Sequence, residues 1–147
     1  ARSDLKVLGF WNRMQQAFFD VTAISPIARS TNSKPVKTLF QQGENRKNRE
    51  YRARVIQVDH GAFQPLVFVT SGGMAPAATM VTKRLGSLIA TRRDMDFSVV
   101  MGWLRTRISF ALLRTVLICL RGTRARQVRA DNSNIELAVH EAKIDHA

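Results

Sequence analysis

Short apolar runs rich in β-branched and aromatic residues predict three strands in the first half of the chain. The first run, residues 17–24 (Ala-Phe-Phe-Asp-Val-Thr-Ala-Ile), ends shortly before Pro26. Residues 55–60 form the second run and residues 65–70 the third. The third run lacks polar alternation, so we expect it to be buried on both faces of a sheet. Residues 5–11 are compatible with a further strand or with an irregular apolar segment.

Helical patterns occupy much of the remaining chain. Residues 44–54 predict a polar helix with basic side chains around most of its surface, and residues 75–91 predict a helix with Pro76 in its first turn. Residues 97–121 give the clearest helical period. Its apolar positions are Val100, Trp103, Leu104, Ile108, Ala111, Leu112, Val116, Leu117 and Cys119.

Together these elements predict a mixed α/β fold with a small central sheet flanked by helices. We expect one domain over residues 1–121, interrupted by an exposed loop at residues 25–43 that is rich in Ser, Thr, Asn, Gln, Lys and Pro. Residues 122–147 predict a flexible tail that is first basic and then acidic.

The chain is strongly basic, with a formal net charge of +12 and a pI near 11.4. Four of its 11 acidic residues and one of its 23 basic residues lie in residues 131–147, which leaves 22 basic and 7 acidic groups in residues 1–130. Such an excess favours a polyanionic partner, and DNA or RNA is the usual one. An anionic membrane surface is the competing partner, and a tolerated basic surface is the simplest alternative.

Cys119 is the single cysteine, which excludes a disulfide within the chain and the spacing of a zinc finger. It lies in an apolar helical run, where we expect a buried small hydrophobic residue. The same run could be mistaken for a membrane span. Arg107, Arg114 and Arg121 share one helix face and argue against a span, because a span needs about 20 residues with few charges and these arginines leave only six uncharged residues between them.

Three separated carboxylates, Asp4, Asp20 and Asp59, are the candidates for chemistry. Asp20 and Asp59 each lie in an apolar run that predicts a strand, where an unpaired charge is costly. A divalent ion, Mg²⁺ or Mn²⁺, would pair with such acids and could support phosphodiester hydrolysis. The alternatives are that Asp59 caps the turn at His60-Gly61, and that Asp20 pairs with an arginine.

Metal-dependent cleavage also requires a cation, for which Lys47 is the candidate, together with Arg49 on the same predicted helix. No lysine follows Asp59 at the spacing of an acid-x-Lys signature, because Gly61 occupies that place. The alternative for Lys47 is a solvated surface lysine.

Several arginines are candidates for contact with the phosphates of nucleic acid. They are Arg46, Arg49, Arg52, Arg107, Arg114, Arg121 and Arg124. Ser71-Gly72-Gly73, ahead of a predicted helix, resembles an anion-binding turn, but no P-loop lysine follows and a plain strand-to-helix turn is the favoured interpretation.

Several sequence blocks resemble the extreme C-terminal region of invertebrate retroelement open reading frames that carry a reverse transcriptase. The blocks are Gly9-Phe10-Trp11, residues 16–21 (QAFFDV), residues 58–68 (VDHGAFQPLVF), Ser71-Gly72-Gly73-Met74 and residues 117–124 (LICLRGTR). The resemblance extends over nearly the whole chain. It implies an intracellular, nuclear module that acts on DNA or RNA downstream of a polymerase, with a restriction-endonuclease-like fold of the PD-(D/E)xK type.

The chain departs from that family at two positions near the candidate site. The family has Glu where this chain has Asp59, and often Arg where it has Thr22. With no polymerase in the chain, a decayed copy is one interpretation. The sequence therefore leaves three functions open: a metal-dependent endonuclease, a non-catalytic nucleic-acid-binding domain, and a protein that binds membrane surfaces through residues 97–121.

Overall fold

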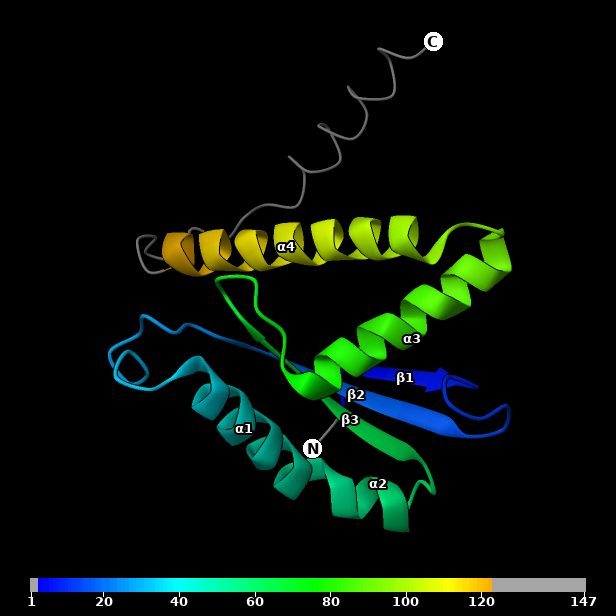
Figure 1. Ribbon diagram of the computed structural model, residues 1–147. Helices are drawn as coiled ribbons and strands as arrows, with labels where there is room; N and C mark the ends of the chain where they lie inside the picture. Colours follow the sequence, from blue (N-terminus) through cyan, green and yellow to red (C-terminus); the bar gives the residue numbers. More distant parts are fainter. Residues whose placement is uncertain (1–2, 123–147) are drawn as a thin grey trace, which may run out of the picture. The chain divides into compact units, whose positions relative to one another are not determined.

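The computed structural model describes residues 3–122 and has the mixed α/β class that the sequence predicts (Figure 1). The chain divides into two compact units after Val116, and the first unit holds the described sheet. The predicted tail at residues 122–147 lies, apart from its first residue, outside the described residues. In chain order the elements are β1 (Leu5–Leu8), β2 (Gln16–Ile24), α1 (Val36–Lys47), the π-helical turn η1 (Asn48–Arg52), α2 (Ala53–Gln57), β3 (Ala62–Val69), α3 (Pro76–Arg93) and α4 (Phe97–Gly122).

The sheet has β2 at its centre, antiparallel to β1 and parallel to β3. Residues 9–15 join β1 to β2, with Gly9 at a φ of 76° that favours glycine. The strands β2 and β3 pair continuously, from Ala17 opposite Ala62 to Ile24 opposite Val69. Parallel neighbours require a long crossover connection, and the helical segment α1–η1–α2 supplies it.

This helical segment covers one face of the sheet (Figure 1). Phe18 of β2 and Phe63 of β3 form a buried cluster with Tyr51 and Val55. The rings of Tyr51 and Phe63 are stacked, with their centroids 5.5 Å apart. Tyr51 and Val55 are four residues apart and therefore share the helix face that contacts the sheet.

Helix α1 approaches the sheet most closely at Gly43. A Cβ atom there would lie 2.9 Å from Val67 Cγ1 and 3.2 Å from Ile24 Cδ1, so only glycine allows this approach. Leu39, one turn earlier, is also buried. The prediction of an exposed loop over residues 25–43 is therefore wrong for residues 36–43, because Leu39 and Gly43 form the inner face of a mainly polar helix.

The predicted strand at residues 55–60 is also wrong. These residues form α2 and the turn after it, so the helix predicted at residues 44–54 continues past its expected end. Val55 is buried against the sheet, whereas Ile56 and Val58 are exposed. β-Branched residues favour strands where they pack against neighbours across strands, and here the segment packs on the sheet through one helical face.

Helix α3 covers the opposite face of the sheet, with α4 packed beside it (Figure 1). Phe19 of β2 contacts Val81 of α3 in one buried cluster. Phe68 of β3, Ala78 of α3 and Leu112 of α4 form another. The sheet is thus a middle layer between two helical layers, and side chains on alternate positions of β2 contact different layers.

The helices predicted at residues 75–91 and 97–121 are confirmed as α3 and α4. The buried face of α4 is narrower than its apolar pattern suggests, since Trp103 is 46 % exposed. Cys119 is exposed, so its predicted burial is wrong. The reason is that Leu112, two turns earlier, is the last buried side chain of the helix.

Candidate functional site

Asp20 lies on the central strand β2 and is only 3 % exposed. Because successive strand residues point to opposite faces, Asp20 shares its face with Phe18 and Thr22, under the segment α1–η1–α2. Burial removes water from the carboxylate and would be costly without a charged partner.

Lys47, the last residue of α1, is that partner. Its Nζ lies 2.8 Å from Asp20 Oδ2, and its side chain is 16 % exposed. The same ammonium lies 5.4 Å from the centre of the Tyr51 ring and 4.0 Å from the carboxylate of Glu50. The interpretation of Lys47 as a solvated lysine is therefore wrong, and Asp20 pairs with a lysine rather than an arginine.

The π-helical turn η1 follows Lys47 directly. Such turns are rare in proteins, and those that occur are often found at functional sites. In this turn Glu50 and Tyr51 come next to the Asp20–Lys47 pair. A hydrogen bond with Glu50, burial of the ring and the negative charge of Asp20 together raise the pKa of Tyr51 from 10.0 to about 12. The Tyr51 hydroxyl therefore keeps its proton well above neutral pH and can donate it in a hydrogen bond.

Asp4, the residue before β1, is the second acid near Asp20. The pairing of Leu5 with Phe19 places Asp4 across from Asp20, one step beyond the last pair of the ladder. Asp4 Oδ2 accepts a hydrogen bond of 2.8 Å from the backbone N–H of Val21. Asp20 in β2 and Asp4 just before β1 thus lie on neighbouring segments at the same end of the β1–β2 pair.

Thr22 occupies the position two residues after Asp20, where an acid-x-Lys signature would have its lysine. A threonine carries no charge, so it cannot fill that role. Lys47 brings an ammonium to the same carboxylate from α1 instead. The charge that the signature places on the strand is here supplied by the helix that crosses over it.

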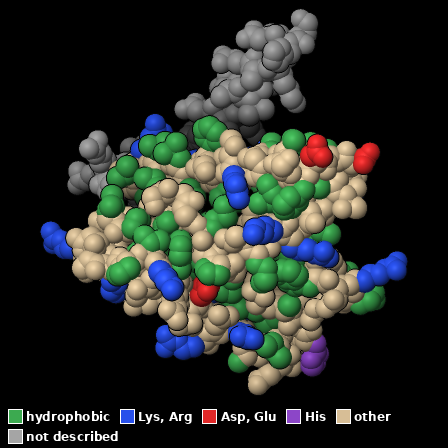
Figure 2. Space-filling view, viewed as in Figure 1, with side chains coloured by type: hydrophobic (Ala, Val, Ile, Leu, Met, Phe, Trp, Pro, Cys, Tyr) green, Lys and Arg blue, Asp and Glu red, His purple; other side chains and the backbone are tan. Residues whose placement is uncertain are grey.

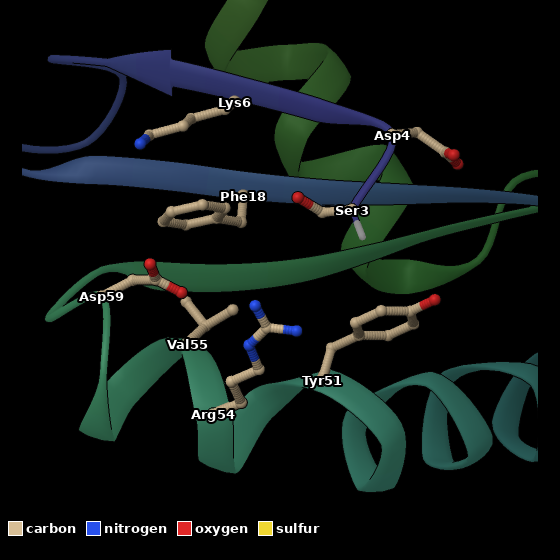
Figure 3. Close-up of a pocket in the computed structure, with 8 residues that line it drawn as sticks. All are labelled: Ser3, Asp4, Lys6, Phe18, Tyr51, Arg54, Val55 and Asp59. Carbon is tan, nitrogen blue, oxygen red and sulfur yellow. The ribbon is translucent and has the colours of Figure 1, made fainter. Parts of the chain in front are cut away.

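Asp59 does not join Asp20 on the sheet. It is exposed in the turn after α2, where His60 has a φ of 47°. Asp59 and Asp4 line one pocket of about 360 Å³, together with Lys6 and Arg54. Figure 3 shows Asp4 and Asp59 at opposite sides of this pocket, with the Arg54 side chain directed between Asp59 and Tyr51.

The carboxylates predicted to hold a metal ion are therefore only partly brought together. Over residues 3–122 the structure contains no group of three or more Asp, Glu, His or Cys side chains placed to hold an ion. Asp59 lies in the turn after α2, away from the sheet, whereas Asp4 precedes β1 and follows the pairing of Leu5 with Phe19 by one residue.

Asp4 and Asp20 are the two predicted metal ligands that remain on neighbouring segments of the sheet. Mg²⁺ is usually held by one or two carboxylates and keeps several waters. Asp20 Oδ2 is fully buried, and its charged neighbour is the ammonium of Lys47, 2.8 Å away. An ion at Asp20 would therefore share the carboxylate with Lys47.

The predicted phosphate-binding arginines are exposed wherever the structure describes them. Arg46 and Arg49 line a shallow pocket beside Thr31. Arg107 lies over the ring of Trp103, 5.0 Å from its centre. The exposed residues are Arg46, Arg49, Arg52, Arg107, Arg114 and Arg121. Arg124 lies outside the described residues.

Ser71-Gly72-Gly73 precedes α3, as predicted, but the first turn of that helix already has an anion. Glu44 Oε1 accepts a hydrogen bond of 3.0 Å from the N–H of Ala77. A carboxylate at this position satisfies a free N–H group and the positive end of the helix dipole. The plain strand-to-helix turn is thus the better interpretation.

The sequence prediction missed Tyr51, Glu50 and Lys6. Tyr51 was within reach of sequence reasoning, because Lys47, Tyr51 and Val55 are spaced four apart and share one helix face. Lys6 shares its strand face with Asp4, and its Nζ lies 5.3 Å from the centre of the Phe18 ring.

Comparison of the chain with models of protein families, with curated proteins and with solved structures finds no match. Among the described helices, none combines the length and the apolar character that a membrane span requires. The class of protein that fold and site define is thus a mixed α/β domain with a buried Asp–Lys pair and a basic exterior.

Proposed function

We propose that this chain is a nucleic-acid-processing module of a retroelement, in which Asp4, Asp20 and Lys47 form a centre for metal-dependent phosphodiester cleavage. The observation that carries the proposal is the buried Asp20, held 2.8 Å from Lys47 with Asp4 across the hairpin. Sheet-based nucleases place one acid on each of two neighbouring strands, which favours a restriction-endonuclease-like module. The net charge of +12 favours a polyanionic substrate.

Each residue has a distinct role in this proposal. A divalent ion held by Asp4 and Asp20 would polarise the phosphate and lower the pKa of its bound water. Lys47, fixed by Asp20, stabilises the negative charge that develops on the phosphate oxygens. Hydrolysis joins the water oxygen to phosphorus and breaks the bond to the leaving sugar oxygen, which gains a proton. Tyr51, protonated at neutral pH, is the nearby hydroxyl donor.

Nicking of supercoiled plasmid DNA, with Mg²⁺ or Mn²⁺ added to the metal-free protein, tests the proposal. Asp20→Asn and Lys47→Met should each lower the nicking rate at least about a hundredfold, because each removes charge that stabilises the transition state. Circular dichroism must show that both variants fold. Nicking that continues at the wild-type rate in folded Asp20→Asn would sink the proposed centre.

Asp59→Asn is the matched control, because Asp59 lines the same pocket as Asp4 but does not face Asp20. We expect its nicking rate to stay within about threefold of wild type, a change of less than 1 kcal/mol in the barrier. Loss of nicking in folded Asp59→Asn would return Asp59 to the centre that the sequence alone predicted and would contradict a centre without it.

A second candidate function is non-catalytic binding of nucleic acid. The observation that favours it is that Lys47 neutralises Asp20, as a purely structural ion pair would. In that case the folded wild type retains plasmid in a gel-shift experiment but releases no nicked product with either metal.

A further inference from the structure

One exposed stripe of α4 alternates aromatic and arginine side chains. Trp103, Arg107, Phe110 and Arg114 are spaced by four, three and four residues. At 100° per residue they fall within about 60° of arc on the helix, so they form one continuous stripe. Trp103 is 46 % and Phe110 68 % exposed.

This stripe is separate from the side of α4 that packs on the protein. The buried side chains of α4, Val100, Met101, Leu104 and Leu112, point about 60–180° away from Trp103 around the helix. Large aromatic rings are thus presented outward in a helix that already has an apolar face for its own core. Their exposure is not needed to fold the domain, which suggests a ligand.

The charge of the helix restricts what that ligand can be. Residues 97–122 contain four arginines and no acidic residue. Arg107 lies with its guanidinium 5.0 Å from the centre of the Trp103 ring, so charge and ring act as one surface. Figure 2 shows the same character more widely, with apolar and basic side chains interspersed over one face of the molecule.

We propose that Trp103, Arg107, Phe110 and Arg114 form a binding platform for single-stranded nucleic acid. Unpaired bases stack on aromatic side chains, and arginines contact the intervening phosphates. The bases of a duplex are already stacked on one another and present no free face to a ring. Two turns of helix separate Trp103 from Phe110, about 10.5 Å, so the rings receive different bases.

This inference deepens and rests on the proposed function, because it names the form of substrate that the cleavage centre would receive. An apolar, basic helix could also bind a second copy of this chain or an anionic membrane surface. Neither of these partners requires flat aromatic rings, so substitutions that remove only the ring separate them from single-stranded nucleic acid.

The test measures binding of the full chain to fluorescein-labelled oligo(dT) and to a blunt duplex of equal length, by fluorescence anisotropy at fixed salt. Trp103→Leu and Phe110→Leu keep an apolar side chain but remove the ring. Each should weaken oligo(dT) binding about five- to 150-fold and change duplex binding less than about twofold. Phe110→Tyr, which keeps a ring, should bind like wild type.

Leu113→Ala is the matched control, since Leu113 is 53 % exposed and lies on the same helix outside the stripe. It should leave both affinities unchanged. The platform would be overturned if the Leu variants lost equal affinity for duplex and oligo(dT), or if neither variant lost affinity for oligo(dT). It would also be overturned by dimerisation that depends on the rings, measured by sedimentation, or by binding to anionic vesicles alone. Arg107→Gln should weaken oligo(dT) binding and reduce its salt dependence by about one counterion.

The failure of this inference can be told from the failure of the cleavage proposal. Nicking that depends on Asp20 and Lys47 but not on the rings, in a protein without preference for oligo(dT), removes the platform alone. Ring-dependent binding of oligo(dT) in a protein that never nicks removes the cleavage centre alone.

Discussion

The ammonium of Lys47 and the Oδ2 atom of Asp20 lie 2.8 Å apart, between the central strand and the helix that crosses it. One partner comes from a strand and the other from the end of a helix, so the pair fixes where α1 ends above the sheet. The same contact that would position a catalytic lysine therefore also links two layers of the fold.

Removing one member of this pair should be more harmful than removing both. Lys47→Met leaves Asp20 buried without a counter-charge, and such single removals cost about 3–5 kcal/mol. The double variant Asp20→Leu/Lys47→Met replaces both charges with apolar groups and should recover most of that loss. Urea unfolding of the wild type, the single variants and the double variant measures the effect. Additive losses would show that the two residues act independently.

Tyr51 is the single tyrosine of the chain, so its ionisation can be followed by absorbance near 295 nm. We expect the folded protein to titrate with a pKa of about 12 and the urea-unfolded chain near 10. Because the folded pKa is raised, this group stabilises the fold fully below pH 10 and loses that contribution as pH rises from 10 towards 12.

Substitutions identify the source of that shift. Glu50→Gln should lower the pKa of Tyr51 most, because the hydrogen bond with Glu50 is the largest cause, and Asp20→Asn should lower it less. Asp59→Asn, in the same pocket, serves as the control and should leave it unchanged. A folded wild type that titrates near 10 would contradict the arrangement of Glu50, Tyr51 and Asp20.

Two glycines should respond oppositely to alanine. A Cβ at Gly61 would lie 2.7 Å from the Phe18 ring and 2.8 Å from the backbone oxygen of Gln16, so Gly61→Ala should cost about 1–3 kcal/mol. At Gly102, in α4, a Cβ meets nothing within 4 Å, so Gly102→Ala should stabilise by about 0.5–1 kcal/mol. Thermal unfolding distinguishes them. A stabilising Gly61→Ala would mean that the turn is looser than described.

The helices and strands of this fold could be predicted where the apolar pattern matched only a helix or only a strand. The strand at residues 17–24 and the long helix at residues 97–121 have such patterns, and both were correct within a residue at each end. Residues 55–60 were assigned wrongly because β-branched side chains suit a strand as well as the inner face of a helix. Only the contact of Val55 with the sheet decides between the two.

The site was predicted in part for a related reason. An acid within an apolar strand signals a partner, and this identified Asp20 from sequence alone. Which partner it has depends on the crossover connection, because Lys47 reaches Asp20 only through the layer that α1 forms over the sheet. The place of Asp4 depends on strand register, which a short apolar run does not define.

The start of α3 provides a final prediction, because Glu44 of α1 occupies the place that an anionic ligand would take there. Its Oε1 accepts a hydrogen bond of 3.0 Å from Ala77 N–H, so Glu44→Ala should cost about 1 kcal/mol by exposing the N–H group and the helix dipole. Glu44→Gln keeps an acceptor without the charge and should lose less.

Sulfate should then separate Glu44→Ala from the wild type. Free N–H groups at a helix start attract anions, so sulfate should stabilise Glu44→Ala more than it stabilises the wild type, in which the carboxylate excludes it. Exclusion of sulfate from the protein surface stabilises both proteins alike, and the difference between them therefore reports the vacated helix start. Urea unfolding at several sulfate concentrations measures that difference. Identical sulfate dependence in the two proteins would show that Glu44 does not occupy the helix start in solution.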